Sequence, residues 1–287
     1  MRIVVLFYRH PELKMPHALH SSLFTLHFLM RHLFPSPVFG PVHSRRLGIS
    51  LGINLLPAEE KVCSFDCIYC ECGYNADTRG HDPLPSREEV REALEQKLIA
   101  MNEEGVQPDV LTFAGNGEPT MHPQFPDIVE DVRALRDRFA PRAKISVLSN
   151  ATRILHDDIF HALCRVDNNI LKLDTISPAF IRMVDRPVSR RYEVEALVER
   201  MAAFNGHCIV QTMFLKGTHE GEDVSNLAET FIAPWLSALA RIRPEQVMIY
   251  TIDRQTPSPL LEKATKEELD AIAQRVEDLG FSCSVAI

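Results

Sequence analysis

Short apolar segments alternate with longer amphipathic segments along most of this 287-residue chain. Short runs rich in β-branched residues are typical of buried strands, and apolar residues that recur at helical spacing indicate amphipathic helices. The strands predicted in this way are 49–56, 109–113, 144–148, 169–173, 208–215, 246–250 and 282–287. The predicted helices are 86–104, 123–139, 157–164, 192–204, 224–239 and 266–279.

The order of these elements determines the fold class. A chain that alternates strand and helix forms a parallel sheet with right-handed crossovers. We therefore predict an α/β fold in which parallel strands curve into an open, partial barrel of the (β/α)6 type. In barrels of this kind the functional side chains lie at the carboxyl ends of the strands.

Composition and charge narrow the class of protein. The hydrophobic content of 45% and the charged content of 24% are ordinary for a globular domain. The net charge of −8 argues against a globally basic nucleic-acid-binding protein, although a local basic patch is compatible with it. No apolar run is as long as a membrane span. We expect a cytoplasmic protein, because seven cysteines with one tight cluster fit metal binding better than a secreted disulfide framework.

The sequence predicts a core domain over residues 37–287 that follows an N-terminal extension over residues 1–36. The extension precedes the first recognisable strand and contains five of the twelve histidines. A histidine-rich tract can bind metal. We instead interpret this segment as a peripheral extension, with Met30 as an alternative start.

Three cysteines, Cys63, Cys67 and Cys70, lie in one short loop after the first predicted strand, with the spacing C-x3-C-x2-C. Thiolates this close together can hold one metal centre. A cuboidal 4Fe-4S cluster normally takes four cysteines, so three of them leave one iron open to a reactive ligand. The loop by itself is also compatible with zinc, for which Cys72 would supply the fourth ligand.

The cysteine loop resembles the signature of the radical S-adenosylmethionine (SAM) superfamily, including the aromatic Tyr69 directly before the third cysteine. The resemblance implies that Cys63, Cys67 and Cys70 hold a 4Fe-4S cluster whose open iron binds the methionine part of SAM. An electron from the cluster then cleaves SAM to give a 5'-deoxyadenosyl radical. The resemblance also implies a radical SAM barrel, a reductant such as flavodoxin or ferredoxin, and a position for Tyr69 beside the adenosyl part of SAM.

Residues 114–120, Ala-Gly-Asn-Gly-Glu-Pro-Thr, predict a glycine-rich turn after the second strand. Glycines at a strand end let the backbone approach a ligand closely, and the Glu118 carboxylate can accept a hydrogen bond from an ammonium group. The turn resembles the Gly-Gly-Glu-Pro segment that binds the SAM amino group in the superfamily. Gly117, Glu118 and Pro119 match that segment, whereas Asn116 replaces its first glycine. The alternative is an ordinary turn without a ligand.

Short polar side chains, those of Ser149 and Asn150, follow the third predicted strand. Such groups suit hydrogen bonds to ribose hydroxyls or to a carboxylate, and they suit the capping of a following helix equally well. Because the superfamily has a polar segment at the same place, the resemblance implies that Ser149 and Asn150 contact SAM.

Lys172 and Asp174 in the fourth predicted strand lie on the same face, since side chains alternate along a strand. Two charged groups that face a barrel interior are costly unless they pair or line a solvated site. We expect Asp174 to line the site. Gln211 in the fifth predicted strand is either another inward polar group or a hydrogen-bonded core residue.

The segment from Phe39 to Gly73 resembles a branch of the superfamily that is related to the tRNA wyosine-base synthases. Those enzymes carry further cysteines upstream for a second cluster. This chain has no cysteine before Cys63, which implies a single cluster. Arg45 and Arg46 lie in the shared segment, where they could bind a substrate phosphate or carboxylate or remain solvated surface charge.

Together these observations predict a radical SAM enzyme that abstracts hydrogen from a substrate. Two narrower functions are open: modification of a tRNA base, and activation of a partner protein by formation of a glycyl radical. In the first, phosphates would be contacted by arginines, namely Arg45, Arg46, Arg182, Arg186, Arg190 and Arg191. A non-catalytic module that holds zinc or iron is the alternative from a different class, and it predicts no SAM binding.

Overall fold

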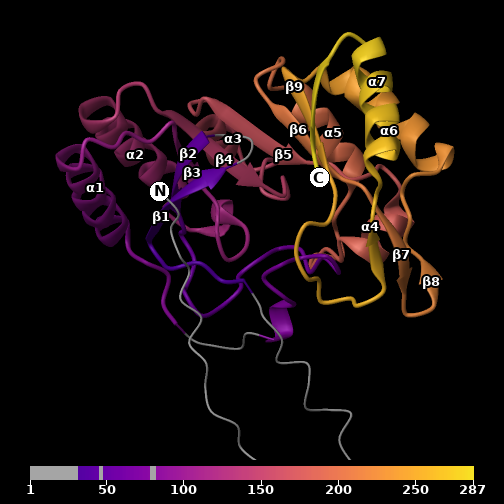
Figure 1. The fold of residues 1–287 in the computed structure, drawn as a ribbon, viewed down its shortest axis with the longest axis horizontal. Coiled ribbons are helices and arrows are strands. Elements are labelled where there is room, and N and C mark those ends of the chain that lie inside the picture. The colour runs from indigo at the N-terminus through magenta and orange to yellow at the C-terminus, as the bar shows by residue number, and fades with distance from the viewer. Residues whose placement is uncertain (1–31, 45–47, 78–81) are drawn as a thin grey trace, which may run out of the picture. The chain divides into compact units, whose positions relative to one another are not determined.

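The computed structural model of the protein describes residues 32–44, 48–77 and 82–287. Within these ranges the main sheet has eight strands in the order β1-β2-β3-β4-β5-β6-β9-β11 (Figure 1). They are β1 (Val38–Ser44), β2 (Gly48–Ile53), β3 (Val110–Phe113), β4 (Lys144–Ser149), β5 (Asn168–Lys172), β6 (Ile209–Met213), β9 (Gln246–Tyr250) and β11 (Ser282–Ala286). β1 pairs with β2 in antiparallel orientation, whereas the other neighbouring strands are parallel.

Helices connect the parallel strands, so that each crossover leads to the next strand of the sheet. They are α1 (Arg87–Glu103), α2 (Phe125–Phe139), α3 (Asp157–Leu163), α4 (Pro178–Val184), α5 (Val194–Ala202), α6 (Glu229–Ile242) and α7 (Lys266–Asp278), with the single-turn helices η1 (Asn75–Asp77) and η2 (Pro119–Met121). The sheet stays open because its outer strands, β1 and β11, do not pair with each other. The predicted α/β fold with a partial parallel barrel is thus confirmed. In the described part of the chain, none of the helices has the length and apolar character of a membrane span.

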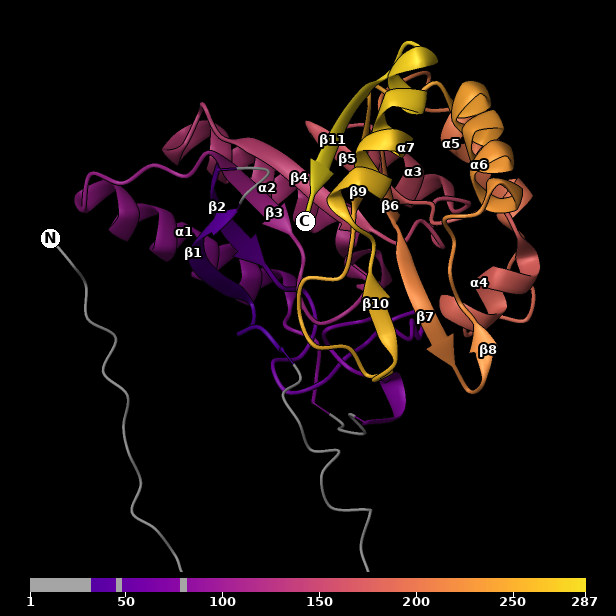
Figure 2. The ribbon, with the colours of Figure 1, turned by 45° about the vertical axis from the view of Figure 1, so that its right-hand side comes forward.

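Some elements were not predicted from the hydrophobic pattern. They are the edge strand β1, the helix α4 and a small antiparallel sheet of β7 (Leu215–His219), β8 (Glu222–Asp223) and β10 (Leu261–Lys263), which Figure 2 shows beyond the end of β6. The predicted strand 208–215 therefore divides into β6 and β7. The predicted helix 224–239 begins only at Glu229. The reason is that Asn226 is held against the start of β7, where its side chain accepts a hydrogen bond from the Leu215 N–H at 3.0 Å.

Side chains alternate along the strands between two faces of the curved sheet. Residues of the outer face, such as Leu111 and Val147, belong to one large apolar core together with helix residues such as Leu98. The inner face is more polar: the Ser50 and Thr112 hydroxyls lie 2.8 Å apart and form a hydrogen bond. Helices thus cover the outer face, and the inner face is left for a site.

The helix predicted over residues 86–104 is present as α1, and it begins with a capping box. The Ser86 hydroxyl accepts a hydrogen bond from the Glu89 N–H at 3.3 Å, and the Glu89 carboxylate accepts one from the Ser86 N–H at 2.7 Å. Because this signal is local in the sequence, it gives the start of the helix correctly.

Candidate active site

The cysteine loop, which we define as residues 61–73, is tied to the glycine-rich turn at the end of β3. Val62 forms an isolated parallel bridge with Gly117, and the Glu118 N–H donates to the Val62 carbonyl oxygen at 3.0 Å. At Gly117, where φ is +135°, an added Cβ would lie 1.9 Å from the same oxygen. Only glycine therefore fits at this contact.

The opposite side of the cysteine loop is held by the connection between α4 and α5. The Asp66 N–H donates to the Asp185 carbonyl oxygen at 3.0 Å, and the Val188 N–H donates to the Ser64 carbonyl oxygen at 2.9 Å. Two segments that are distant in the sequence thus fix the backbone that carries the predicted cluster ligands.

Lys61 lies close to the charges of all three predicted cluster ligands. Burial by itself would lower the pKa of Lys61, but negative charge on Cys70, Cys63 and Cys67 raises it above its usual value. The ammonium group donates to the Gly73 carbonyl oxygen at 2.7 Å. A cation at this place offsets the negative charge that three thiolates bring to a buried metal centre.

The thiol groups differ in their surroundings. Burial raises the pKa of Cys63 to about 12, whereas a hydrogen bond with Cys72 lowers that of Cys70 to about 6. The lowered pKa favours the thiolate of Cys70, which is the form that binds metal. The Cys72 sulfur also lies near two carbonyl oxygens that its single S–H can reach, those of His32 at 3.5 Å and Gly115 at 3.7 Å.

The three thiols fit an iron–sulfur cluster by the chemistry of their donor atoms. Thiolate sulfur is the donor that such clusters take, and a cuboidal cluster binds each thiolate at a different iron. Zinc instead gathers its ligands around a single ion. In the ranges that the structure describes, no group of three or more histidine, cysteine or acidic side chains is arranged to hold one metal ion. The cluster assignment of Cys63, Cys67 and Cys70 remains a prediction with which this donor set agrees.

Glu118, the predicted partner of the SAM amino group, is buried where three loops meet. Its carboxylate accepts hydrogen bonds from the Thr120 N–H at 3.1 Å, the Thr120 hydroxyl at 2.5 Å, the Ser149 hydroxyl at 2.9 Å and the Asn150 N–H at 2.6 Å. Burial raises the pKa of Glu118, while these donors favour its charged form. Glu118 therefore joins the glycine-rich turn to the end of β4, a structural role that the sequence did not predict.

Asn150 links the end of β4 to the cysteine loop. Its Nδ2 donates to the Ser64 hydroxyl at 2.9 Å and to the Cys63 sulfur at 3.5 Å. The Phe65 N–H donates to the same sulfur at 3.5 Å. Hydrogen bonds to ligand sulfurs tune the reduction potential of a cluster. The SAM contacts of Ser149 and Asn150 stay predictions, and the structure adds a contact between Asn150 and a predicted ligand.

Asn116, which replaces the first glycine of the family segment, uses its side chain to hold the turn in place. It is fully buried, and its Nδ2 donates to the Pro57 carbonyl oxygen at 2.7 Å and to the Phe34 carbonyl oxygen at 2.9 Å. Its Oδ1 accepts from the Phe34 N–H at 2.7 Å. Asn116 thus connects the glycine-rich turn with the described residues of the predicted extension. Arg45, Arg46 and residues 1–31 lie outside the described ranges.

Lys172 is the centre of a buried charge cluster beside Cys67. Its ammonium contacts the Tyr69 hydroxyl and the Asp174 carboxylate, and lies 2.8 Å from the Asp185 carboxylate. The Tyr69 hydroxyl donates to Asp174, and the Cys67 thiol donates to Asp185 at 3.8 Å. Lys172 and Asp174 therefore pair with each other. Pairing was one of the two arrangements expected for charged groups that face the barrel interior, the other being that they line a solvated site. Asp185 was missed because it ends α4, which the hydrophobic pattern does not predict.

A cavity of about 600 Å³ lies between the inner face of the sheet and the cysteine loop. Its lining from the sheet consists of Phe39, Val42, His43, Ser50, Gly52, Thr112, Leu148, Ile170, Gln211 and Met248. Strands β2 to β9 contribute only uncharged side chains to this described lining, and Gln211 is one of them. Gly117 reaches the cavity, and Glu71 and Arg254 form an ion pair at its border.

A smaller cavity of about 340 Å³ adjoins the first, since Glu71 and Arg254 line both. Tyr69 and Cys70 line this second cavity. The volumes of both cavities are typical of small-molecule sites. Of the residues predicted to contact SAM, Gly117 lines the larger cavity and Tyr69 the smaller one, whereas Glu118, Ser149 and Asp174 are buried and belong to neither lining.

The fold and the loop together define a class of protein: a partial parallel barrel that carries three cysteines in the loop after its first parallel strand. The family model of the Radical SAM superfamily matches residues 61–231, which is more than half of the chain. The chain belongs to the radical SAM superfamily, as the sequence predicted.

Curated relatives include two UPF0026 proteins. One, from Helicobacter pylori, is 29% identical over 222 residues, which are 77% of this chain and 67% of the relative. Another, from Methanocaldococcus jannaschii, is 34% identical over 182 residues, which are 62% of this chain and 53% of the relative. The chain thus spans about half to two thirds of the length of these relatives.

Solved structures of radical SAM proteins share the fold at low identity. A radical SAM methyltransferase from Sphaerobacter thermophilus has a TM-score of 0.61 and 13% identity, over 83% of this chain and 65% of that one. SuiB from Streptococcus suis bound to S-adenosylmethionine has a TM-score of 0.57 and 14% identity, over 82% and 50%. TYW1 with a lysine–pyruvate adduct has a TM-score of 0.56 and 14% identity, over 80% and 73%.

We predict that Glu118→Gln weakens SAM binding by about tenfold or more, because a charge-assisted hydrogen bond to the ammonium group is lost. Iron content should stay unchanged. The measurement is equilibrium dialysis of SAM against the reconstituted protein, with iron determined in the same samples. Thr120→Val is the matched control, since it removes a donor to Glu118 but keeps the carboxylate. Unchanged affinity in Glu118→Gln would contradict the assigned role.

We predict that Lys172→Met lowers the free energy of unfolding by about 3–5 kcal/mol, because it leaves the buried Asp174 and Asp185 without their cation. The double variant Lys172→Met/Asp185→Asn should recover part of this loss. Arg138→Met, which breaks an exposed ion pair with Glu95, should cost less than about 1 kcal/mol. Urea denaturation measures the free energy of unfolding of all three variants. Equal losses in Lys172→Met and Arg138→Met would show that the stability of the buried charge cluster does not depend on the charge of Lys172.

Proposed function

We propose that this protein is a radical SAM enzyme in which Cys63, Cys67 and Cys70 hold a 4Fe-4S cluster and SAM binds beside it. When bound, the cluster and SAM supply a 5'-deoxyadenosyl radical that abstracts hydrogen from the substrate. The observation that carries the proposal is the cysteine loop that packs against the glycine-rich turn through the bridge between Val62 and Gly117, with Cys70 lining a cavity of about 340 Å³ that adjoins the larger one. Membership of the superfamily supports it, and SuiB, which shares the fold, was solved with SAM bound.

In this proposal the residues of the chain position the cofactors and exclude water. Lys61 offsets the charge of the thiolates, and Asn150 with the Phe65 N–H holds the Cys63 sulfur. SAM is contacted by residues on the loops at the carboxyl ends of β2 to β5. These are Tyr69, Gly117, Glu118, Pro119, Ser149, Asn150 and Asp174. The buried charge cluster around Lys172 keeps Tyr69 in place beside the third cysteine.

The lining of the larger cavity supports a class of reacting group. Strands β2 to β9 present hydroxyls, apolar side chains and the amide of Gln211, which suit an uncharged, hydrogen-bonding group, while Glu71 and Arg254 in the same lining pair with each other. A tRNA base and the glycine of a partner protein both have this character. A reductant of the flavodoxin or ferredoxin type, available in the cytoplasm, completes the proposal.

The test is the formation of 5'-deoxyadenosine after anaerobic reconstitution with iron and sulfide and reduction by dithionite in the presence of SAM. We expect product from the unaltered protein and none from Cys67→Ala, because the cluster loses a ligand. Cys208→Ala, which changes a buried cysteine outside the cysteine loop, should retain the product. A protein that takes up only zinc and binds no SAM would instead be a non-catalytic metal module.

A further inference from the structure

A basic surface lies on the last turn of α4 and on the connection between α4 and α5. We define the arginine surface as Arg182, Pro187, Val188, Arg190 and Arg191. The three arginines are exposed, and no acidic side chain among the described residues pairs with them. The chain as a whole has a net charge of −8, so this positive charge is a local feature. Glu195, which lies nearby, pairs with Arg241 instead.

The arginine surface has an apolar centre. The Val188 side chain is 65% exposed, and no large hydrophobic side chain of the described residues is more exposed. Pro187 precedes it. Exposed apolar groups surrounded by arginine are typical of protein–protein interfaces. Nucleic-acid affinity rests instead on phosphate neutralisation, for which an apolar centre has no use. The composition therefore favours a protein as the partner.

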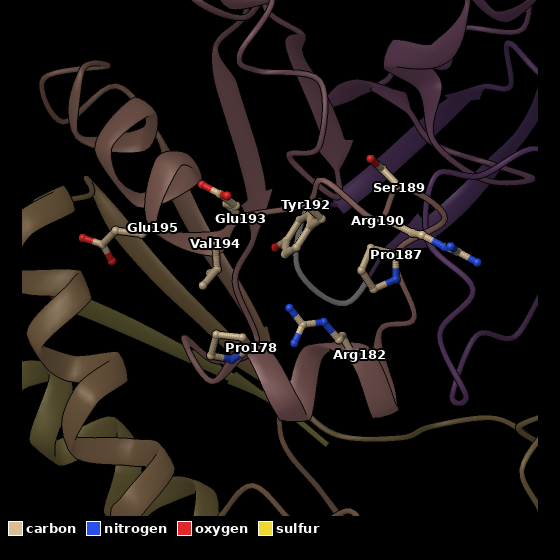
Figure 3. Close-up of a pocket in the computed structure, with 9 residues that line it drawn as sticks. All are labelled: Pro178, Arg182, Pro187, Ser189, Arg190, Tyr192, Glu193, Val194 and Glu195. Atoms are coloured by element: carbon tan, nitrogen blue, oxygen red, sulfur yellow. The ribbon is translucent and has the colours of Figure 1, made fainter.

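A pocket of about 390 Å³ opens within this surface (Figure 3). Its lining includes Arg182, Pro187, Arg190 and Tyr192, together with the acidic Glu193 and Glu195. Figure 3 shows the carboxylates that border the pocket on the side away from Arg190. The Tyr192 ring packs edge-to-face against Phe65 of the cysteine loop, with 5.3 Å between the ring centroids. The pocket thus offers a recess for a protruding side chain of a partner, directly over the cysteine loop.

The arginine surface lies one hydrogen bond away from the backbone that carries the predicted cluster ligands. Val188 donates to Ser64, the residue after Cys63, at 2.9 Å. Asp185 accepts from Asp66, the residue before Cys67, at 3.0 Å. A protein docked on this surface is therefore separated from the cluster site by little more than the cysteine loop itself.

We propose that the arginine surface docks a small acidic protein that carries electrons to the cluster. The proposal rests on the function proposed above, which requires the cluster to be reduced. One electron passes from the reduced carrier to the cluster, so the carrier is oxidised by one electron, the cluster is reduced by one, and no proton or group is transferred. Opposite charge on the two proteins steers their encounter, and the apolar centre fixes their orientation.

The test compares two double variants with the same change of charge. Arg190→Glu/Arg191→Glu reverses two charges on the arginine surface. The control, Arg142→Glu/Lys144→Glu, reverses two charges at exposed residues by the amino end of β4. Reduced flavodoxin is the probe. Its affinity is measured by titration, and the rate of cluster reduction by stopped-flow absorbance, at low and high salt. We expect the first variant to weaken binding and slow reduction by about tenfold or more at low salt, and the second to match the unaltered protein.

Dithionite, which is too small to need a docking surface, should reduce both variants at the unaltered rate. Flavodoxin affinity and reduction rates that are equal in the two double variants would overturn the proposal. The proposal is also overturned if Arg190→Glu/Arg191→Glu loses affinity for a tRNA while flavodoxin reduces the cluster of this variant at the unaltered rate. Failure of the proposed function is a separate result, because the unaltered protein would then form no 5'-deoxyadenosine with dithionite.

Discussion

The contact between the Val62 carbonyl and Gly117 is the constraint on which the site depends. It leaves no room for a side chain at residue 117, and it holds the turn after β3 against the cysteine loop. From this turn Glu118 reaches the end of β4, and from there Asn150 reaches the Cys63 sulfur. Loops from three neighbouring strands thus become one hydrogen-bonded unit. Such a unit fixes the side chains that it carries more firmly than separate loops would.

Electrostatics sets the second constraint. Thiolates and carboxylates that are taken out of water are costly unless a cation accompanies them. Lys61 is the cation that accompanies the three thiols, and Lys172 is the cation that pairs with Asp174 and Asp185. Both lysines lie at the carboxyl edge of the sheet. The side chains that β2 to β9 contribute to the larger cavity are uncharged, which suits the proposed hydrogen abstraction by a radical.

Local sequence signals predicted most of the fold and the parts of the site. The strand 246–250 and the helix α1 have the predicted positions, because hydrophobic runs and periodicity depend only on neighbouring residues. The cysteine spacing and the glycine-rich turn likewise gave the loops that the structure brings together. Their mutual contact follows from the parallel sheet, whose carboxyl ends meet at one edge.

What the sequence did not predict depends on contacts between distant segments. Asp185 belongs to the site only because α4 packs behind the cysteine loop, and its own neighbours give no sign of this. Asn116 was interpreted only as a departure from a family pattern, although its buried amide connects residues 34 and 57. Glu118 was expected to face a ligand, and the four hydrogen bonds that its carboxylate accepts come from the turn after β3 and from the end of β4.

The central claim is that the three cysteines hold a cluster with one iron open to SAM. Electron paramagnetic resonance of the reconstituted, reduced protein tests it most directly, before and after addition of SAM. If the three cysteines hold such a cluster, we expect the signal of a reduced 4Fe-4S cluster that changes shape when SAM is added, because SAM binds the open iron. A cluster signal that SAM leaves unchanged would contradict an iron open to SAM. A protein that holds zinc and gives no signal would contradict the cluster itself.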